Sequence, residues 1–178
     1  MHYVLISFIL LLSGCASIPE GIEPVKNFQV ARYLGTWYEI ARLDHSFERG
    51  MQQVTAEYSL RDDGGIKVIN RGFKQAQQQW AQAEGKAYFV QDPHTGYLKV
   101  SFFGPFYGAY IIFDLDENYQ HSLITSTNKS YLWILARTPH IDAAQQQRLL
   151  KRITELGFAS EQLIFVEHPE RLNHSIKN

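Results

Sequence analysis

Short segments in which apolar and polar residues alternate follow one another along most of this chain, separated by turn sequences. In the clearest, residues 52–60, Val54, Ala56 and Tyr58 share one face with Leu60. Connections as short as Asp62-Asp63-Gly64-Gly65 force successive strands to run antiparallel. Eight strands that close on one another avoid exposed edges and leave room for one small ligand. We therefore expect an all-β fold, an eight-stranded antiparallel up-and-down β-barrel, with strands at 36–44, 52–60, 66–74, 80–90, 97–103, 106–115, 119–127 and 131–138.

A helical pattern follows the last of these segments. Asp142 can cap a helix that stops at Gly157, with Gln145 as the partner of a capping box. Its apolar residues form one stripe, which predicts a helix packed outside against the barrel wall: Leu149, Leu150, Ile153 and Leu156. A short strand is expected at 163–166, which ends a single barrel-and-helix domain over 29–166. The tail, 167–178, is polar.

Composition limits the possible partners. The chain has 178 residues, a length that one hydrophobic core can serve. Its 17 basic and 18 acidic residues give a net charge of -1, so no uniform positive field would attract nucleic acid, and no nucleic-acid partner is expected. The only cysteine is Cys15, which excludes an internal disulfide, a cysteine-based metal site and a catalytic thiol in the domain.

The N-terminus carries a short apolar run at residues 3–12. It is too short for a bilayer, which needs about 20 helical residues, so residues 1–14 are expected to be a signal peptide. Leu12-Ser13-Gly14-Cys15 resembles the bacterial lipobox, in which lipid is attached to the cysteine after cleavage. Met1-His2 departs from that pattern by lacking Lys or Arg, and an ordinary signal peptide with a chance cysteine is the alternative.

The lipobox resemblance implies a location. A lipidated Cys15 would hold the domain on a membrane, since several acyl chains anchor stably. Ala16 rather than Asp follows the cysteine, as in lipoproteins that the sorting machinery sends to the outer membrane. The resemblance thus implies a lipid-anchored protein of a Gram-negative outer membrane, facing the periplasm. Residues 15–28, with Pro19, Gly21 and Pro24, are expected to form the lipidated N-terminus and a tether.

The meander brings Trp37 and Arg137 to one end of the barrel, because the first strand leaves that end and the eighth returns to it. There the guanidinium can lie over the indole face. Gly35 is expected where the chain turns sharply into the first strand.

Strand parity predicts which residues face the interior. Glu39 shares a face with Trp37 and Ala41, and a carboxyl group inside the barrel needs a partner, either Arg71 or a tyrosine hydroxyl. Small residues of the fourth strand, Ala83, Gly85 and Ala87, would leave room, and Leu98 and Leu135 are also expected inside. The candidate ligand-binding residues are Ala56, Tyr58, Phe89, Val100, Phe102, Tyr110, Ile112, Tyr131 and Trp133.

The loops at the other end of the barrel should form an opening. They carry aromatic and apolar residues with basic neighbours, which suits an amphiphile or an anionic membrane surface: Phe47, Met51, Trp80, Phe103, Phe106, Tyr107, Arg49, Lys74 and Lys129. Acidic residues gather at the opposite end: Asp62, Asp63, Asp92, Asp116 and Glu117. Aspartate is also a common turn residue, so this asymmetry has a second, purely structural interpretation.

Four segments resemble the lipocalin family: 32–42 with its Gly35-Thr36-Trp37, 68–72, 100–108 and 131–139. The bacterial outer-membrane lipocalins are the most similar branch, and apolipoprotein-D-like proteins are more distant. The resemblance implies the eight-stranded barrel, a short helical turn near 30–33 that closes the Trp37 end, and binding of lipid in the barrel. The family's second motif is matched only loosely, by Thr55-Ala56-Glu57-Tyr58.

The expected function is binding, storage or transport of fatty acids, lysophospholipids or similar amphiphiles. About 16 buried methylenes at roughly 0.8 kcal/mol each contribute on the order of 13 kcal/mol before the costs of association. One alternative is a structural or partner-binding lipoprotein whose barrel is filled by its own side chains. Another is a lipid-modifying enzyme, but the chain has no Gly-x-Ser-x-Gly elbow, no His-Glu-x-x-His pair and no phosphate-binding glycine loop. No catalytic residue, cofactor or metal is expected.

Overall fold

The computed structural model describes residues 18–169 and contains the eight expected strands. Turns of Asp, Gly and Pro residues interrupt the alternating segments, and each strand ends within a few residues of the predicted bounds. The strands are β1 (Gly35–Arg42), β2 (Met51–Leu60), β3 (Ile66–Lys74), β4 (Gln79–Phe89), β5 (Tyr97–Phe103), β6 (Phe106–Leu115), β7 (His121–Thr125) and β8 (Leu132–Ala136).

All neighbouring strands pair antiparallel in chain order, and β1 closes the barrel by pairing with both β8 and β2. The β1–β2 pairing covers only the first half of β1, from Gly35 opposite Tyr58 to Tyr38 opposite Thr55. Beyond it, the short strand β9 (Ile164–Phe165) adds to β1, and the Gln53 N–H donates to the carbonyl of Glu167 at 2.9 Å. The start of the predicted polar tail therefore bridges the upper part of β1 and β2.

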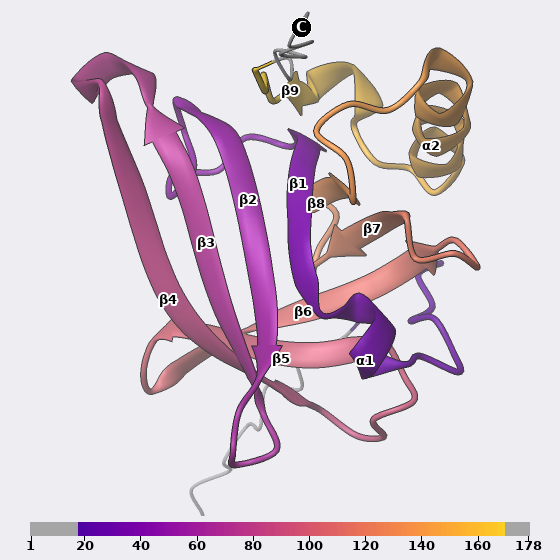
Figure 1. Ribbon diagram of the computed structural model, residues 1–178. Coiled ribbons are helices and arrows are strands. Elements are labelled where there is room, and N and C mark those ends of the chain that lie inside the picture. Colours follow the sequence, from indigo (N-terminus) through magenta and orange to yellow (C-terminus); the bar gives the residue numbers. More distant parts are fainter. Residues whose placement is uncertain (1–17, 170–178) are drawn as a thin grey trace, which may run out of the picture.

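The helix α2 (Ala143–Glu155) lies outside the barrel beside β7 and β8 (Figure 1). The Asp142 carboxylate accepts the Gln145 N–H at 2.8 Å, as predicted, and Gly157 follows the helix at φ +76°. Leu149 and Ile153 are fully buried against outward-facing residues of the wall such as Ile134. The apolar stripe of the helix therefore forms a second core outside the barrel.

One end of the barrel is closed by the short helix α1 (Val30–Tyr33), which we call the floor together with the residues packed on it. Trp37 is completely buried, and its indole N–H donates to the Tyr33 carbonyl at 2.8 Å. The Arg137 guanidinium lies 4.0 Å from the Trp37 ring centroid, which is the predicted stacking. It also donates to the Thr36 and Leu34 carbonyls at 2.8 and 2.9 Å, which ties the last strand to the start of the first.

The segment expected to be a tether is packed from residue 18 onward. Ile22 is buried in the outer core and Phe28 in the floor, at 6% and 1% exposure. The Val25 N–H donates to the Ile112 carbonyl, and its carbonyl accepts the Gly96 N–H, both at 2.9 Å. The expectation of an unpacked tether over 15–28 was wrong for residues 18–28, because a few well-spaced apolar side chains suffice to hold an extended segment against an existing core.

The acidic residues at the floor end mainly build turns. Asp116 accepts the N–H groups of Asn118 and Gln120, and Asp63 accepts that of Gly65 while pairing with Arg61. These contacts support the structural interpretation of the acidic end. Among the helices of residues 18–169, none combines the length and the apolar composition that a membrane span requires.

Candidate ligand cavity

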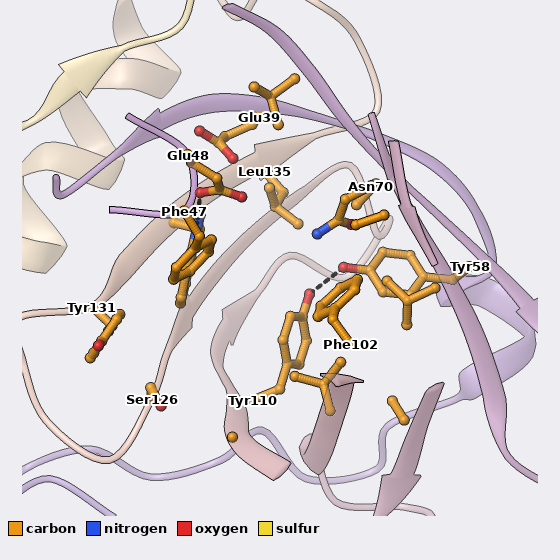
Figure 2. Close-up of a pocket in the computed structure, with 18 of the residues that line it drawn as sticks. Glu39, Phe47, Glu48, Tyr58, Asn70, Phe102, Tyr110, Ser126, Tyr131 and Leu135 are labelled. Atoms are coloured by element: carbon orange, nitrogen blue, oxygen red, sulfur yellow. Dashed lines mark hydrogen bonds between the residues drawn. The ribbon is translucent and has the colours of Figure 1, made fainter. Parts of the chain in front are cut away.

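The barrel encloses a cavity of about 820 Å³, within the range of roughly 300–1,000 Å³ usual for small-molecule sites. It opens at the end opposite the floor, through the loops β1–β2, β3–β4, β5–β6 and β7–β8, which we call the mouth. Figure 2 shows side chains from several strands pointing into this space. Seven of the nine predicted ligand-binding residues line the cavity: Ala56, Tyr58, Val100, Phe102, Tyr110, Tyr131 and Trp133.

Phe89 and Ile112 were expected to line the cavity as well, but neither is among its lining residues. Phe89 packs in the floor with its ring centroid 6.0 Å from that of Phe28, which itself lines the cavity. Ile112 is fully buried and is held by backbone hydrogen bonds to Val25 and Gly96. Both errors have the same cause. Strand parity alone predicts an open interior at this end of the barrel, whereas the packed N-terminal segment fills it.

Two further expectations about the interior need correction. Leu60 ends β2 beyond the floor and is 61% exposed, so it does not face inward as predicted. A Cβ on Gly85 would lie 2.8 Å from the Phe102 ring. The space that this glycine leaves inside the barrel is therefore taken by Phe102, whereas Ala83 and Ala87 line the cavity as expected.

Three tyrosines form a hydrogen-bonded chain near the floor. The Tyr110 hydroxyl lies 2.8 Å from that of Tyr58 and 2.9 Å from that of Tyr33, and the Tyr58–Tyr110 bond is drawn in Figure 2. Burial raises the pKa of Tyr33 to about 12 and those of Tyr58 and Tyr110 well above the ordinary value. The hydroxyl groups near the floor are thus neutral, and the uncharged amide of Asn70 lies next to them (Figure 2).

A β-bulge at Ile40 and Ala41 supplies the partner of Glu39. The extra residue breaks the alternation, so Ala41 joins the outer core and Arg42 turns to the inner side. Its guanidinium donates to the Glu39 carboxylate at 2.6 Å, and both side chains are almost completely buried. Neither of the two predicted partners was correct, since Arg71 pairs with Glu57 in a half-exposed ion pair.

A second carboxyl group, Glu48 from the β1–β2 loop, completes a buried cluster near the mouth. Arg42 donates to the backbone carbonyl of Glu48 at 2.8 Å, and the indole N–H of Trp133 donates to the Glu48 carboxyl at 3.0 Å. The imidazole Nε2 of His45 lies 3.4 Å from the same carboxyl group. Sequence alone did not single out Glu48, because only the folded loop brings it beside Glu39.

The cluster has unusual proton affinities. Burial, and then the charge of Glu48, raise the pKa of Glu39 to about 8 despite Arg42, and burial also raises the pKa of Glu48. Burial, and then the charge of Arg42, lower the pKa of His45 to about 4. Two carboxyl groups thus share one buried guanidinium, and at neutral pH the cluster retains a proton while His45 is uncharged.

These pKa shifts predict how stability depends on pH. Folded Glu39 keeps a proton that the unfolded chain has already released, so stability falls as pH rises towards about 8. His45 acts in the opposite sense between about pH 4 and 6.5, where only the unfolded chain binds its proton. We therefore expect the free energy of unfolding to decline between about pH 6.5 and 8, where the carboxyl groups act alone.

Urea unfolding across this pH range would measure the decline. The variant Glu39→Gln, which imitates the protonated carboxyl, should flatten it. Glu84→Gln removes a carboxylate from the outer wall, where Glu84 pairs with Lys67, and should leave it unchanged. A slope that persists in Glu39→Gln would show that another group titrates.

The mouth carries large exposed aromatic side chains, as predicted. Phe103 and Phe106, on either side of the β5–β6 turn, are 80% and 78% exposed, and Phe47 is 58% exposed. The predicted basic rim is less complete, because the Arg49 guanidinium pairs with Asp44 at 2.6 Å. Of the three basic residues predicted for the rim, Lys74 lines the cavity.

No group of three His, Cys, Asp or Glu side chains that could hold a metal ion is found within residues 18–169. Cys15, the expected lipid attachment site, and residues 170–178 of the predicted tail lie outside the described residues.

Comparisons with known proteins agree with the barrel and the cavity. A sequence model described as a lipocalin-like domain matches residues 28–168. The outer membrane lipoprotein Blc of Vibrio cholerae is 52% identical, over 89% of this chain and 93% of its own length. Apolipoprotein D of Macaca fascicularis is more distant, at 35% identity over 77% of this chain and 82% of its own length. Insecticyanin from the tobacco hornworm Manduca sexta shares the fold, with a TM-score of 0.69 at 18% identity over 86% of this chain and 88% of its own.

The expected localisation agrees with these comparisons, because the Vibrio relative is named as an outer membrane lipoprotein of a Gram-negative bacterium. Lipocalins are in general proteins of binding and transport. With a closed eight-stranded barrel, one outer helix, a floor built on Trp37 and Arg137, and a matching sequence model over most of its length, this chain belongs to the lipocalin family.

Proposed function

We propose that the protein binds long-chain amphiphiles, such as fatty acids or lysophospholipids, in its barrel, and stores or transports them in the bacterial envelope without chemical change. The observation that carries this proposal is the cavity of about 820 Å³ with a predominantly apolar wall, a closed floor and an opening at the opposite end. An alkyl chain placed there removes its methylenes from water at roughly 0.8 kcal/mol each. The deep hydroxyl groups are neutral and place no charge against the end of such a chain.

The empty space in the barrel argues against the alternative function, a structural lipoprotein whose barrel is filled by its own side chains. Phe102 and the floor residues occupy part of the interior, yet space for a ligand remains above them. The candidate ligand-binding residues are the seven that line this space, together with Glu39, which strand parity placed inside the barrel, and with Glu48 and Asn70, which strand parity did not indicate.

Native mass spectrometry of the gently purified protein tests the proposal directly. We expect a co-purified lipid, and saturable quenching of tryptophan emission when a fluorescent fatty acid is titrated into the delipidated protein. The indole of Trp133 lines the cavity and reports on its occupant. Absence of both signals would favour a structural role, whereas release of a fatty acid from an added lysophospholipid would identify an enzyme.

We further propose that the protein is held on the outer membrane, facing the periplasm, by acyl chains on Cys15, after recognition by the lipoprotein sorting machinery. Cys15→Ala removes the only thiol to which lipid can be attached. We expect this variant to move from the membrane fraction to the soluble fraction, because the acyl chains supply the membrane affinity. Cysteine-free protein that still sediments with membranes would contradict a lipid anchor at this position.

A further inference from the structure

Two acidic side chains of the cavity wall lie together near the mouth. Glu39 and Glu48 both line the cavity, and Figure 2 draws their carboxyl groups next to each other. Arg42, which lies behind them, is 1% exposed and is not among the lining residues. Its Nη1 donates to the Glu39 carboxyl group, and its Nη2 donates to the backbone carbonyls of Glu48 and Met51. The cluster therefore presents carboxyl oxygens to the cavity. The two terminal nitrogens of the guanidinium are already engaged, and its Nε–H has no partner among the described residues but is buried away from the cavity.

Aromatic rings surround the same place. The Phe47 and His45 rings stack with centroids 4.2 Å apart, and the Trp133 centroid lies 4.9 Å from that of His45. Tyr131 stacks on Trp133 at 6.0 Å. Of these four rings, Phe47, Tyr131 and Trp133 line the cavity. Aromatic faces beside carboxyl groups attract cations and offer nothing to an anion.

His45 adds an unused acceptor to this corner. It is 7% exposed, and neither ring nitrogen has a hydrogen-bond partner among the described residues, although Nε2 lies 3.4 Å from the Glu48 carboxyl. Buried polar groups of proteins are nearly always hydrogen-bonded. A neutral imidazole has one nitrogen that accepts and one that donates, so an N–H donor at this corner would satisfy the accepting nitrogen.

From this geometry we infer that the corner formed by Glu39, Glu48, His45 and the rings of Phe47 and Trp133 binds a primary ammonium group at the head of the amphiphile. The inference rests on the proposed function, since it assumes that an alkyl chain enters first and leaves the head group near the mouth. A primary ammonium supplies three N–H donors and one positive charge. It can donate to oxygens of both Glu39 and Glu48, which line the cavity, and its charge lets both carboxyl groups ionise beside Arg42.

An anionic head group has a different place to bind. Lys74 lines the mouth on β3, opposite Met51 in the register with β2. A carboxylate there would avoid Glu39 and Glu48, so preference for an anion would place the head group at Lys74 and would overturn our inference.

The test compares three ligands that share a dodecyl chain, namely dodecylammonium, dodecanol and dodecanoate, titrated below their micelle concentrations into delipidated full-length protein at neutral pH. We expect dodecylammonium to bind about tenfold more tightly than dodecanol, and dodecanoate to bind less tightly than both. Equal affinities, or the reverse order, would overturn the ammonium site while leaving the proposed function intact. Failure of all three to bind would instead contradict the proposed function.

A variant that removes one charge tests whether the preference for dodecylammonium comes from the Glu39–Glu48 carboxyl groups. Glu48→Gln keeps an acceptor for the Trp133 indole but removes one charge, so affinity for dodecylammonium should fall about tenfold and affinity for dodecanol should not change. Glu84→Gln, the matched change on the outer wall, should leave all three affinities as they were. Unaltered ammonium binding by Glu48→Gln would overturn the assignment. If that variant folds poorly, the ranking of the three ligands on the unmodified protein still decides whether the cavity prefers an ammonium head group.

Discussion

Replacing Arg42 by methionine is expected to lower the free energy of unfolding by about 3–5 kcal/mol. The guanidinium is almost fully buried, pairs with Glu39 at 2.6 Å, and donates to the carbonyls of Glu48 and Met51 at 2.8 and 3.0 Å. Methionine fills a similar volume but leaves a buried carboxyl group and two carbonyls without their donors. Urea denaturation followed by tryptophan fluorescence would measure the loss.

Arg71→Met is the matched control for this effect. Arg71 also makes an ion pair, with Glu57 at 2.7 Å, but its side chain is 39% exposed. Exposed pairs are worth at most about 1 kcal/mol, so this variant should remain close to the unmodified protein. Similar losses in both variants would mean that burial of the Glu39–Arg42 pair has no special importance for the fold.

Substituting tryptophan for Ala56 is expected to have the largest effect on ligand binding. Ala56 lies on β2 between Trp37 of β1 and Asn70 of β3, and its side chain lines the cavity. An indole there would displace about three to five methylenes of an alkyl chain, at a cost of about 2–4 kcal/mol. Affinity for a long-chain fatty acid should therefore fall by about 30-fold to 1,000-fold, measurable by fluorescence titration.

Ser59→Trp provides the comparison, because Ser59 is an exposed residue on the outer face of the same strand. The added ring is the same, but it does not enter the barrel, and the affinity should stay unchanged. Retained binding in Ala56→Trp, with a folded barrel, would locate the ligand outside the cavity.

Much of this fold could be predicted because the deciding information is local. The bounds of β3, β5 and β6 match the alternating segments, since a period of two marks a sheet with one buried face. The Asp142 cap and the stacking of Arg137 on Trp37 were also predicted. The first follows from a side chain near its backbone target, and the second from strand direction together with the lipocalin resemblance.

The predictions failed where one irregularity of the backbone changes the orientation of all the side chains that follow it in the strand. A bulge reverses side-chain parity, and nothing in the composition of Ile40-Ala41-Arg42 reveals that the chain bulges there. Arg42 was for this reason not recognised as the interior partner of Glu39. The prediction of an unpacked tether failed at Phe28 for a different reason. The burial of this side chain depends on a groove that exists only after the barrel has closed.

The position of Glu48 could not have been predicted from spacing either. It comes from a loop, and its approach to Glu39 is set by hydrogen bonds from Arg42 and Trp133. Strand periodicity contains no information on such contacts. The interior of the barrel was thus predictable as an apolar wall, whereas its charged corner was not.

The floor has a kinetic consequence. Because α1, Phe28 and Trp37 close one end, an occupant of the barrel can neither enter nor leave through the floor. A second molecule cannot push the first out from behind, so exchange of one lipid for another proceeds only as fast as the resident molecule escapes. The exchange rate should accordingly be independent of the concentration of the incoming lipid.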